Sequence, residues 1–186
     1  MDNNNIVKGI KAGDKNAFDI FYQQYNLELF RTAFLILGNS QDAEDVLQET
    51  FICAYRNIKS LRDEEKLKAW LFTIMKNFAY KKIKKRDREV PDENILLKVD
   101  SYSMKNEEID YSCDVKIEDA LTKINPKQRE VLVLYYYSGF SIKEIAKITG
   151  NFQGTVKSRL HLAKKQLKKI IENDFNLFES EGINEG

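Results

Sequence analysis

The chain has 186 residues, 30 of them Lys or Arg and 29 Asp or Glu, so its formal net charge is only +1. This length suits one domain or two small ones, and the net charge taken alone argues against a strongly basic nucleic-acid-binding protein. Apolar residues make up 42% of the chain, and no glycine occurs between Gly38 and Gly139. This composition favours a packed helical protein over a disordered chain or a turn-rich β-sandwich.

The first half predicts three helices, over 15–37, 40–57 and 66–88. Asp14 can cap the first of them, Gly38 ends it, and Ser40 can cap the second. The N-terminus before residue 15 is polar and lacks the apolar core of a signal peptide. We therefore expect an N-terminal helical domain over residues 1–88.

The segment 89–115 has a different character. It contains Pro91 and eight acids against two lysines, a net charge of −6, with little apolar periodicity. A stretch of this length is long for a connection inside a compact domain. It is predicted to be an acidic interdomain linker, within which a short helix could form.

Residues 116–172 predict a second helical domain. A helix over 115–124 precedes Asn125-Pro126, a cap followed by proline, and the next helix stops at Gly139. Ser141 opens a capping box for a short helix that ends at Gly150, and Asn151 can cap a last helix to about 172. The tail over 173–186 has four acids and no base, and we expect it to fray.

Residues 141–167 have the layout of a helix-turn-helix motif. The last helix has an inner apolar stripe, which leaves its far side free to enter a DNA major groove. Residues 155–172 hold six Lys or Arg against one acid. The inner stripe is Val156, Leu160, Ala163 and Leu167, and the far side has Ser158, His161, Lys165 and Lys168 with Thr155 and Lys157 nearby. The alternative is a helical hairpin with a solvated lysine face.

The helix over 40–57 has one core face and one polar face. The core face would hold Val46, Leu47, Thr50, Phe51 and Ala54. An apolar residue within an acidic and polar patch is a plausible docking surface, although a solvated helix face would look similar. The polar face consists of Asp42, Asp45, Gln48, Glu49 and Ile52.

The helix over 66–88 combines aromatic and basic side chains. Residues 76–88 carry seven Lys or Arg against one acid. Aromatic rings can stack on unpaired bases, Asn can bond their edges and Lys can hold phosphate, so this stripe suits single-stranded DNA. A position partly in the core is an alternative for Trp70. Leu71, Met75, Phe78, Ala79 and Lys82 share one side of the helix, and the opposite stripe is Trp70, Thr73, Asn77, Tyr80 and Lys84.

Three stretches resemble motifs of bacterial sigma factors. They are DAEDVLQETF at 42–51, similar to the polymerase-binding helix, AWLFTIMKN at 69–77, similar to the promoter-melting helix, and GTVKSRLH at 154–161, similar to the recognition helix. They occur in the family's order within residues 10–170. The total length is typical of the compact extracytoplasmic-function (ECF) class.

The resemblance implies an all-α fold of two small helical domains joined by an acidic linker, with a helix-turn-helix in the C-terminal domain. It implies a cytoplasmic transcription initiation factor with no catalysis, cofactor or metal, and no membrane insertion. The partners would be core RNA polymerase, through the clamp helices of its largest subunit, promoter DNA and, as is usual in the family, an anti-sigma factor. The linker would thread through positively charged nucleic-acid channels of the polymerase; the alternative is a tether that only adds solubility.

The family's roles can be transferred to the matching residues of this chain. Leu162 stands where many relatives have arginine, which leaves the promoter sequence open. The loop over 59–66 would help to hold an extruded base. The polymerase-binding residues would be Asp42, Asp45, Gln48, Glu49 and Ile52; those for the −10 element Trp70, Thr73, Asn77, Tyr80, Lys81 and Lys84; and those for the −35 element Thr155, Lys157, Ser158, Arg159, His161, Lys164 and Lys165.

Three other functions are considered. A DNA-binding regulator with a helical effector or dimerisation domain would not need both the acidic patch and the basic-aromatic stripe. An enzyme is disfavoured because the chain has one histidine, no glycine-rich phosphate loop and no recognisable catalytic motif. A helical adaptor would leave every basic patch as solvated surface. The small net charge is a cancellation between basic helices and acidic segments, so we expect the free protein to bind promoter DNA weakly.

Overall fold

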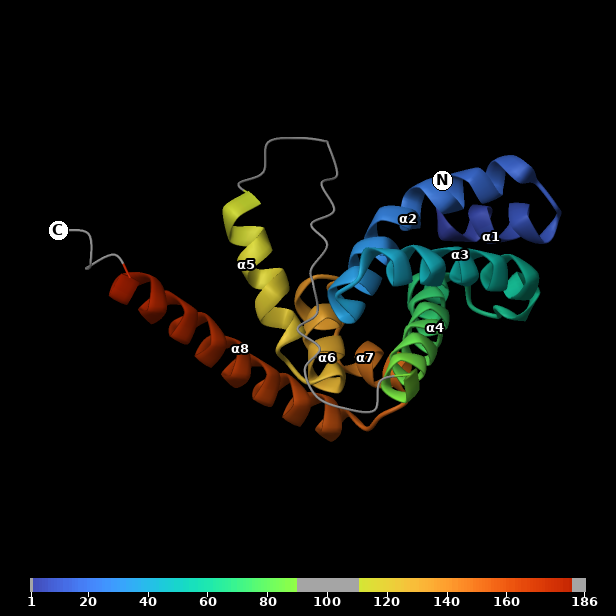
Figure 1. The fold of residues 1–186 in the computed structure, drawn as a ribbon. Helices are drawn as coiled ribbons and strands as arrows, with labels where there is room; N and C mark the ends of the chain where they lie inside the picture. The colour runs from blue at the N-terminus through green and yellow to red at the C-terminus, as the bar shows by residue number, and fades with distance from the viewer. Residues whose placement is uncertain (1, 90–110, 182–186) are drawn as a thin grey trace.

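The computed structural model describes residues 2–89 and 111–181, and every regular element in those ranges is helical. The N-terminal part contains α1 (Asn3–Lys11), α2 (Lys15–Leu37), α3 (Ser40–Asn57) and α4 (Leu67–Glu89). Two 3₁₀ turns, Ile58–Ser60 and Glu64–Lys66, connect α3 to α4. The C-terminal part contains α5 (Tyr111–Thr122), α6 (Pro126–Tyr136), α7 (Ile142–Thr149) and α8 (Gln153–Glu181) (Figure 1).

Helix α1 is an element that the sequence analysis did not predict. It is amphipathic, and it buries Ile6, Val7 and Ile10 while packing against α2. Asp2 caps it by accepting a hydrogen bond from the Asn5 amide at 2.8 Å. Its first residues are polar, so the sequence did not predict a helix there, although three apolar residues follow with helical spacing.

The ends of α2 and α3 agree with the expected caps at two positions and differ at one. Asp14 accepts from the Asn16 amide, and Gly38 ends α2 in the left-handed conformation with φ 69°. The cap of α3 is Asn39, whose side-chain oxygen accepts from the Asp42 amide at 2.8 Å. The prediction of Ser40 as the cap is therefore wrong by one residue, because Ser40 already lies in the first turn.

The helix-turn-helix forms as predicted from its caps. Asn125 caps α6, Ser141 and Glu144 form a reciprocal capping box on α7, and Gly150 ends α7 with φ 68°. The α6 helix ends at Tyr136, three residues before Gly139.

Helix α8 departs from the prediction at both ends. The side-chain Nδ2 of Asn151 donates backwards to the Thr149 carbonyl at 3.0 Å, and the Val156 backbone N–H donates to the Phe152 carbonyl, so Asn151 does not cap the helix. The helix also continues to Glu181, through much of the tail that was expected to fray. Of the predicted linker, residues 90–110 lie outside the described residues, and 111–115 belong to α5.

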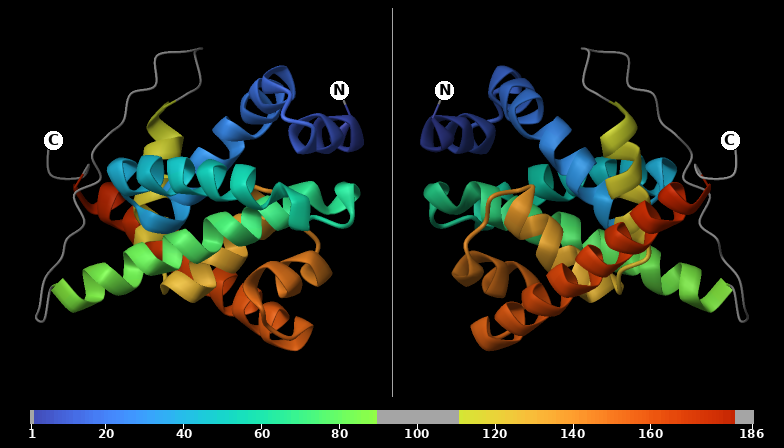
Figure 2. Two further views of the ribbon diagram at one scale, coloured as in Figure 1. Left: turned by 90° about the vertical axis from the view of Figure 1, so that its right-hand side faces the viewer. Right: turned by 90° about the vertical axis from the view of Figure 1, so that its left-hand side faces the viewer.

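The two groups of helices pack against each other. Helix α2 contacts α5 and α6, and α4 contacts α7. In both views of Figure 2, α7 lies beside α4. The two parts thus share a buried boundary, on which residues of α4 meet the C-terminal domain.

The identity of the α3 cap can be tested by substitution. Asn39→Ala should lower the free energy of unfolding by about 1 kcal/mol, because it removes the acceptor of the Asp42 amide. Ser40→Ala, the matched control, should change it by less than about 0.5 kcal/mol. Urea unfolding measures both, and a larger loss in Ser40→Ala would contradict the assignment.

Candidate functional site

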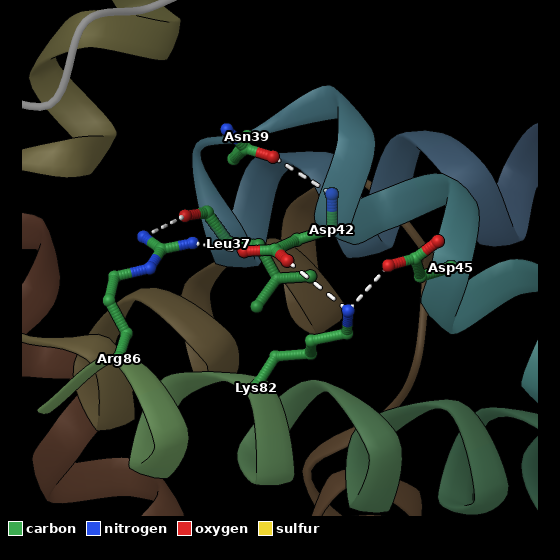
Figure 3. Close-up of polar contacts among 6 residues, drawn as sticks. All are labelled: Leu37, Asn39, Asp42, Asp45, Lys82 and Arg86. Atoms are coloured by element: carbon green, nitrogen blue, oxygen red, sulfur yellow. Dashed lines mark hydrogen bonds and ion pairs between the residues drawn. The ribbon is translucent and has the colours of Figure 1, made fainter. Parts of the chain in front are cut away.

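The acidic end of α3 is held against α4 by ion pairs (Figure 3). Lys82 Nζ lies 2.5 Å from Asp45 Oδ2 and 3.4 Å from Asp42 Oδ1. Arg86 bonds Asp42 Oδ2 at 2.5 Å and also donates to the Leu37 carbonyl at 3.3 Å. The hydrogen bond from Lys82 lowers the pKa of Asp45, and the same bond raises the pKa of Lys82. Asp42 and Asp45 therefore join two helices of the chain itself.

Among the described residues, the outward part of α3 makes no such ion pairs with α4. Gln48 and Glu49 are exposed, and Ile52 keeps 52% of its surface accessible. Tyr55, one turn further on, is equally exposed and packs edge-to-face on Phe18. Sequence reasoning missed Tyr55, although its position three residues after Ile52 places it on the same face.

The residues of α4 that were predicted to bind DNA lie in different environments in the structure. Asn77, Lys81 and Lys84 are exposed. Trp70 is half-buried and packs against the core, as the alternative for that residue anticipated. The Thr73 hydroxyl donates to the Ala69 carbonyl of its own helix at 2.8 Å. The remaining residue of the stripe, Tyr80, contacts the C-terminal domain.

The Tyr80 hydroxyl donates to Glu130 Oε2 of α6 at 2.9 Å. Glu130 is 1% exposed, and its Oε1 has no hydrogen-bond partner among the described residues. Burial raises the pKa of Glu130 to about 7, although Tyr80, Lys76 and Arg159 act in the opposite direction. Burial and the neighbouring Glu130 also raise the pKa of Tyr80.

A second buried ionisable group lies beside Glu130. Arg129 is 4% exposed, and burial lowers its pKa to about 10. One guanidinium nitrogen donates to the Leu121 carbonyl at 3.4 Å, and Nε has no partner in the described part of the chain. Two adjacent ionisable residues are thus buried on α6, and burial of charged groups is costly.

Further contacts join α2 and α4 to the loop after α6. Lys68 Nζ donates to the Ser138 carbonyl at 3.2 Å and lies 2.7 Å from Glu28. The hydroxyls of Thr32 and Ser138 are 3.0 Å apart. The rings of Phe72 and Phe140 meet edge-to-face with centroids 4.9 Å apart.

Sequence reasoning missed this interface. One signal was present, since Arg129 and Glu130 directly precede the longest apolar run of the chain. A charged pair at that place indicates buried partners but does not say which helix supplies them.

Helix α8 presents its expected faces. Val156, Leu160 and Ala163 are buried and Leu167 is half-buried, which confirms the inner stripe. Thr155 and Arg159 are half-buried, and Arg159 lies close enough to Glu130 and Tyr80 to lower the pKa of both. Phe152, just before the helix, is 87% exposed. The exposed predicted residues are Lys157, Ser158, His161, Lys164 and Lys165.

Comparison with known proteins matches both halves of this architecture. Residues 21–89 match the family model for Sigma-70 region 2, and residues 114–167 match the model for Sigma-70, region 4. The ECF RNA polymerase sigma factor SigW of Bacillus subtilis is 31% identical over 178 residues, covering 90% of this chain and 95% of SigW. The chain belongs to the ECF sigma factors.

Other relatives agree with this assignment. SigL of Mycobacterium tuberculosis is 30% identical over 172 residues, covering 89% of this chain and 95% of SigL. Among solved structures, the sigma factor RpoE of Bartonella quintana, in complex with the anti-sigma factor NepR, matches with a TM-score of 0.66 and 30% identity, over 82% of this chain and 96% of RpoE. CnrH, solved with the cytosolic domain of CnrY, has a TM-score of 0.69 at 22% identity and supports the fold.

Family membership settles the class of function. This ECF sigma factor is a promoter-recognising transcription initiation factor that acts with RNA polymerase, and it is not an enzyme. The region 2 match runs from within α2 to the end of α4, and the region 4 match runs from within α5 into α8. Within the described residues, no helix is both long and apolar enough to cross a membrane.

The environment of Glu130 predicts a pH dependence of stability. Its pKa is about 7 in the folded protein against 4.5 for an ordinary Glu, so the folded state binds more protons between these values. The free energy of unfolding should therefore fall as pH rises from about 4.5 to 7, by up to about 3 kcal/mol. Asp45, with its lowered pKa, stays ionised over this range.

Urea unfolding at pH 5, 6, 7 and 8 measures this dependence. Glu130→Gln should flatten the curve because the amide does not titrate. Glu49→Gln, a change at an exposed position on α3, should leave the wild-type slope intact. An unaltered slope in Glu130→Gln would assign the effect to another group.

Proposed function

We propose that this ECF sigma factor binds core RNA polymerase through α3, the −10 element through α4 and the −35 element through α8. The observation that carries this proposal is the separation of three exposed surfaces, one polar and apolar on α3 and two basic on α4 and α8. Basic helices suit phosphate contacts, and an apolar residue in a polar rim suits a protein partner.

Gln48, Glu49 and Ile52 are the proposed contacts with core RNA polymerase, because the side chains of all three are exposed to solvent. Asp42 and Asp45 remain proposed contacts of the same face, and their free oxygen lone pairs can accept bonds from a partner while Lys82 and Arg86 hold them in place. The clamp helices of the largest subunit are the proposed partner surface.

For DNA, the proposed −10 contacts are Asn77, Tyr80, Lys81 and Lys84, with Trp70 and Thr73 at the edge of the stripe. The loop over 59–66 lies at the start of α4 and is proposed to help to hold an unpaired base. The proposed −35 contacts are Ser158 and His161 for bases and Thr155, Lys157, Arg159, Lys164 and Lys165 for phosphates or flanking groups.

An anti-sigma protein is proposed as a further partner. The Bartonella quintana RpoE structure contains the anti-sigma factor NepR, which supports this proposal for a related chain. Binding of core polymerase and of an anti-sigma protein would then exclude each other on α3 and α4.

The polymerase surface is tested by Ile52→Arg combined with Gln48→Ala. Both residues are exposed, so the melting temperature should hold while the affinity for core polymerase falls by about tenfold or more. Leu27→Arg, at a position 50% exposed on α2, is the matched control and should bind normally. Fluorescence anisotropy with labelled factor gives the affinities, and unchanged binding in the double variant would refute the surface.

Promoter melting is tested by Asn77→Ala. Asn77 is exposed, so the variant should fold and bind core polymerase normally, yet open-complex formation should fall several-fold because a base-edge contact is lost. Permanganate reactivity of unpaired thymines on the upstream region of the factor's own gene measures opening. Gln23→Ala, an exposed amide on α2, serves as control; wild-type reactivity in Asn77→Ala would contradict the role.

Reading of the −35 element is tested by comparing His161→Ala with Lys165→Ala. Loss of a base contact should cost about 1–3 kcal/mol and relax sequence preference at one position. Loss of a phosphate contact should weaken all sequences alike and reduce the slope of log affinity against log salt by about 1. Measurements of holoenzyme binding to altered promoter sequences at several salt concentrations distinguish these two effects. Identical behaviour of His161→Ala and Lys165→Ala would contradict the division of roles.

A further inference from the structure

The loop over 59–66, which connects α3 to α4, is held from outside by the N-terminal helix α1. This helix contacts both 3₁₀ turns that lie between α3 and α4. At its last residue, Lys11 Nζ donates to the Leu61 carbonyl at 3.0 Å and to Glu64 Oε1 at 3.2 Å. The side chain of Arg62, between these two acceptors, is exposed. One ammonium group therefore bridges the two ends of the segment that presents Arg62 to solvent.

Helix α1 is itself fixed on α2, which gives Lys11 a rigid base. The three buried apolar residues of α1 pack in the core of the N-terminal domain. The Tyr25 hydroxyl donates to Asn3 Oδ1 at 2.9 Å. A Cβ added at Gly9 would lie only 2.5 Å from Ala17 Cβ, so the two helices approach as closely there as a glycine allows. The backbone that bears Lys11 is thus held in place relative to α2.

Lys11 also offsets negative charge in the loop. Asp63, Glu64 and Glu65 are consecutive acids at the start of the helix proposed to bind DNA, where carboxylates oppose the approach of phosphates. Lys66 pairs with Asp63, and Lys11 pairs with Glu64. Hydrogen bonds from its own backbone and from Lys11 lower the pKa of Glu64. The same lysine therefore holds the loop backbone and reduces its repulsion of DNA.

We infer that Lys11 is a positioning residue for the capture of an unpaired −10 base by the loop over 59–66. By holding the Leu61 carbonyl and Glu64, it sets the backbone from which Arg62 reaches the base. A guanidinium group suits this contact, because it can stack on a base or bond to its edge. Lys11 itself touches no DNA and acts through the loop.

The match to Sigma-70 region 2 assigns no role to this lysine. The matched residues begin at 21, whereas α1 ends at Lys11. The inference rests on the proposed function of the loop in holding an unpaired base, but the anchoring contacts themselves do not. Anchoring and base capture are therefore measured separately.

Three variants separate positioning from direct contact. Lys11→Met removes the ammonium group and keeps an unbranched side chain, and Arg62→Ala removes the proposed contact with the base. Lys15→Met makes the same change of charge at an exposed position on α2 and is the matched control. All three should melt close to the wild type, because the Lys11–Glu64 pair is partly exposed and such pairs contribute little to stability.

Hydrogen–deuterium exchange of the free full-length factor measures anchoring. The amides of residues 59–66 should exchange several-fold faster in Lys11→Met than in the wild type, because the loop has lost two contacts. Lys15→Met should exchange like the wild type. Unchanged exchange of the loop in Lys11→Met would overturn the positioning role.

Run-off transcription with purified core polymerase measures base capture. The templates contain the upstream region of the factor's own gene, with each position of the −10 element changed in turn to each of the other bases. Lys11→Met should lose several-fold of the base preference at one position and keep its preferences elsewhere, and Arg62→Ala should lose it at the same position. Lys15→Met should show the wild-type profile.

Two results of the transcription experiment would overturn the inference. One is an unchanged set of preferences in Lys11→Met, which would show that the loop needs no anchor. The other is a loss of activity in Lys11→Met that is equal for all templates, which would leave Lys11 a purely structural residue. If the wild type itself shows no preference at any −10 position, the proposed function fails, while the anchoring measured by exchange stands.

Discussion

Burial of one face of α4 is the constraint on which the arrangement of both domains depends. Leu71, Phe72, Met75 and Ala79 are all fully buried, which fixes the rotation of the helix about its axis. Once that face is fixed, Lys82 and Arg86 are directed to α3 and Tyr80 to α6. Asn77, Lys81 and Lys84 are left to solvent. One hydrophobic face thus determines which polar residues hold the fold and which remain for partners.

The ion pairs between α3 and α4 have a positioning role more than a stabilising one. Their side chains are 24–43% exposed, and partly exposed pairs contribute little each because solvent screens them. Asp42 and Asp45 nevertheless keep a fixed orientation, since two cations from one helix hold them. A partner that binds this face meets carboxylates whose side-chain entropy has already been lost.

Local sequence signals predicted most of the helices and several caps, because those features depend on residues close together in the chain. Asp14, Asn125, the Ser141–Glu144 box and Gly150 all act where their spacing placed them. The inner stripe of α8 follows from the helical period in the same way. The two basic helices were also identified from local charge.

Long-range pairing could not be predicted in this way. The sequence placed Asp42 and Asp45 on a free polar face, because nothing nearby shows that Lys82 and Arg86 lie opposite. Tyr80 was assigned by its place on α4, and its partner Glu130 is 50 residues away. Helix α1 was missed because its stability comes from long-range packing against α2 and the two 3₁₀ turns before α4.

Gly38 both ends helix α2 and takes part in the packing between the two domains. Its left-handed backbone ends α2, a requirement that lies wholly within the N-terminal domain. A Cβ added there would lie 3.1 Å from Thr122 Cγ2, so the same missing side chain also gives α5 its space. The turn that ends α2 thus shapes the surface that receives the other domain, and any larger residue would alter helix termination and interdomain fit together.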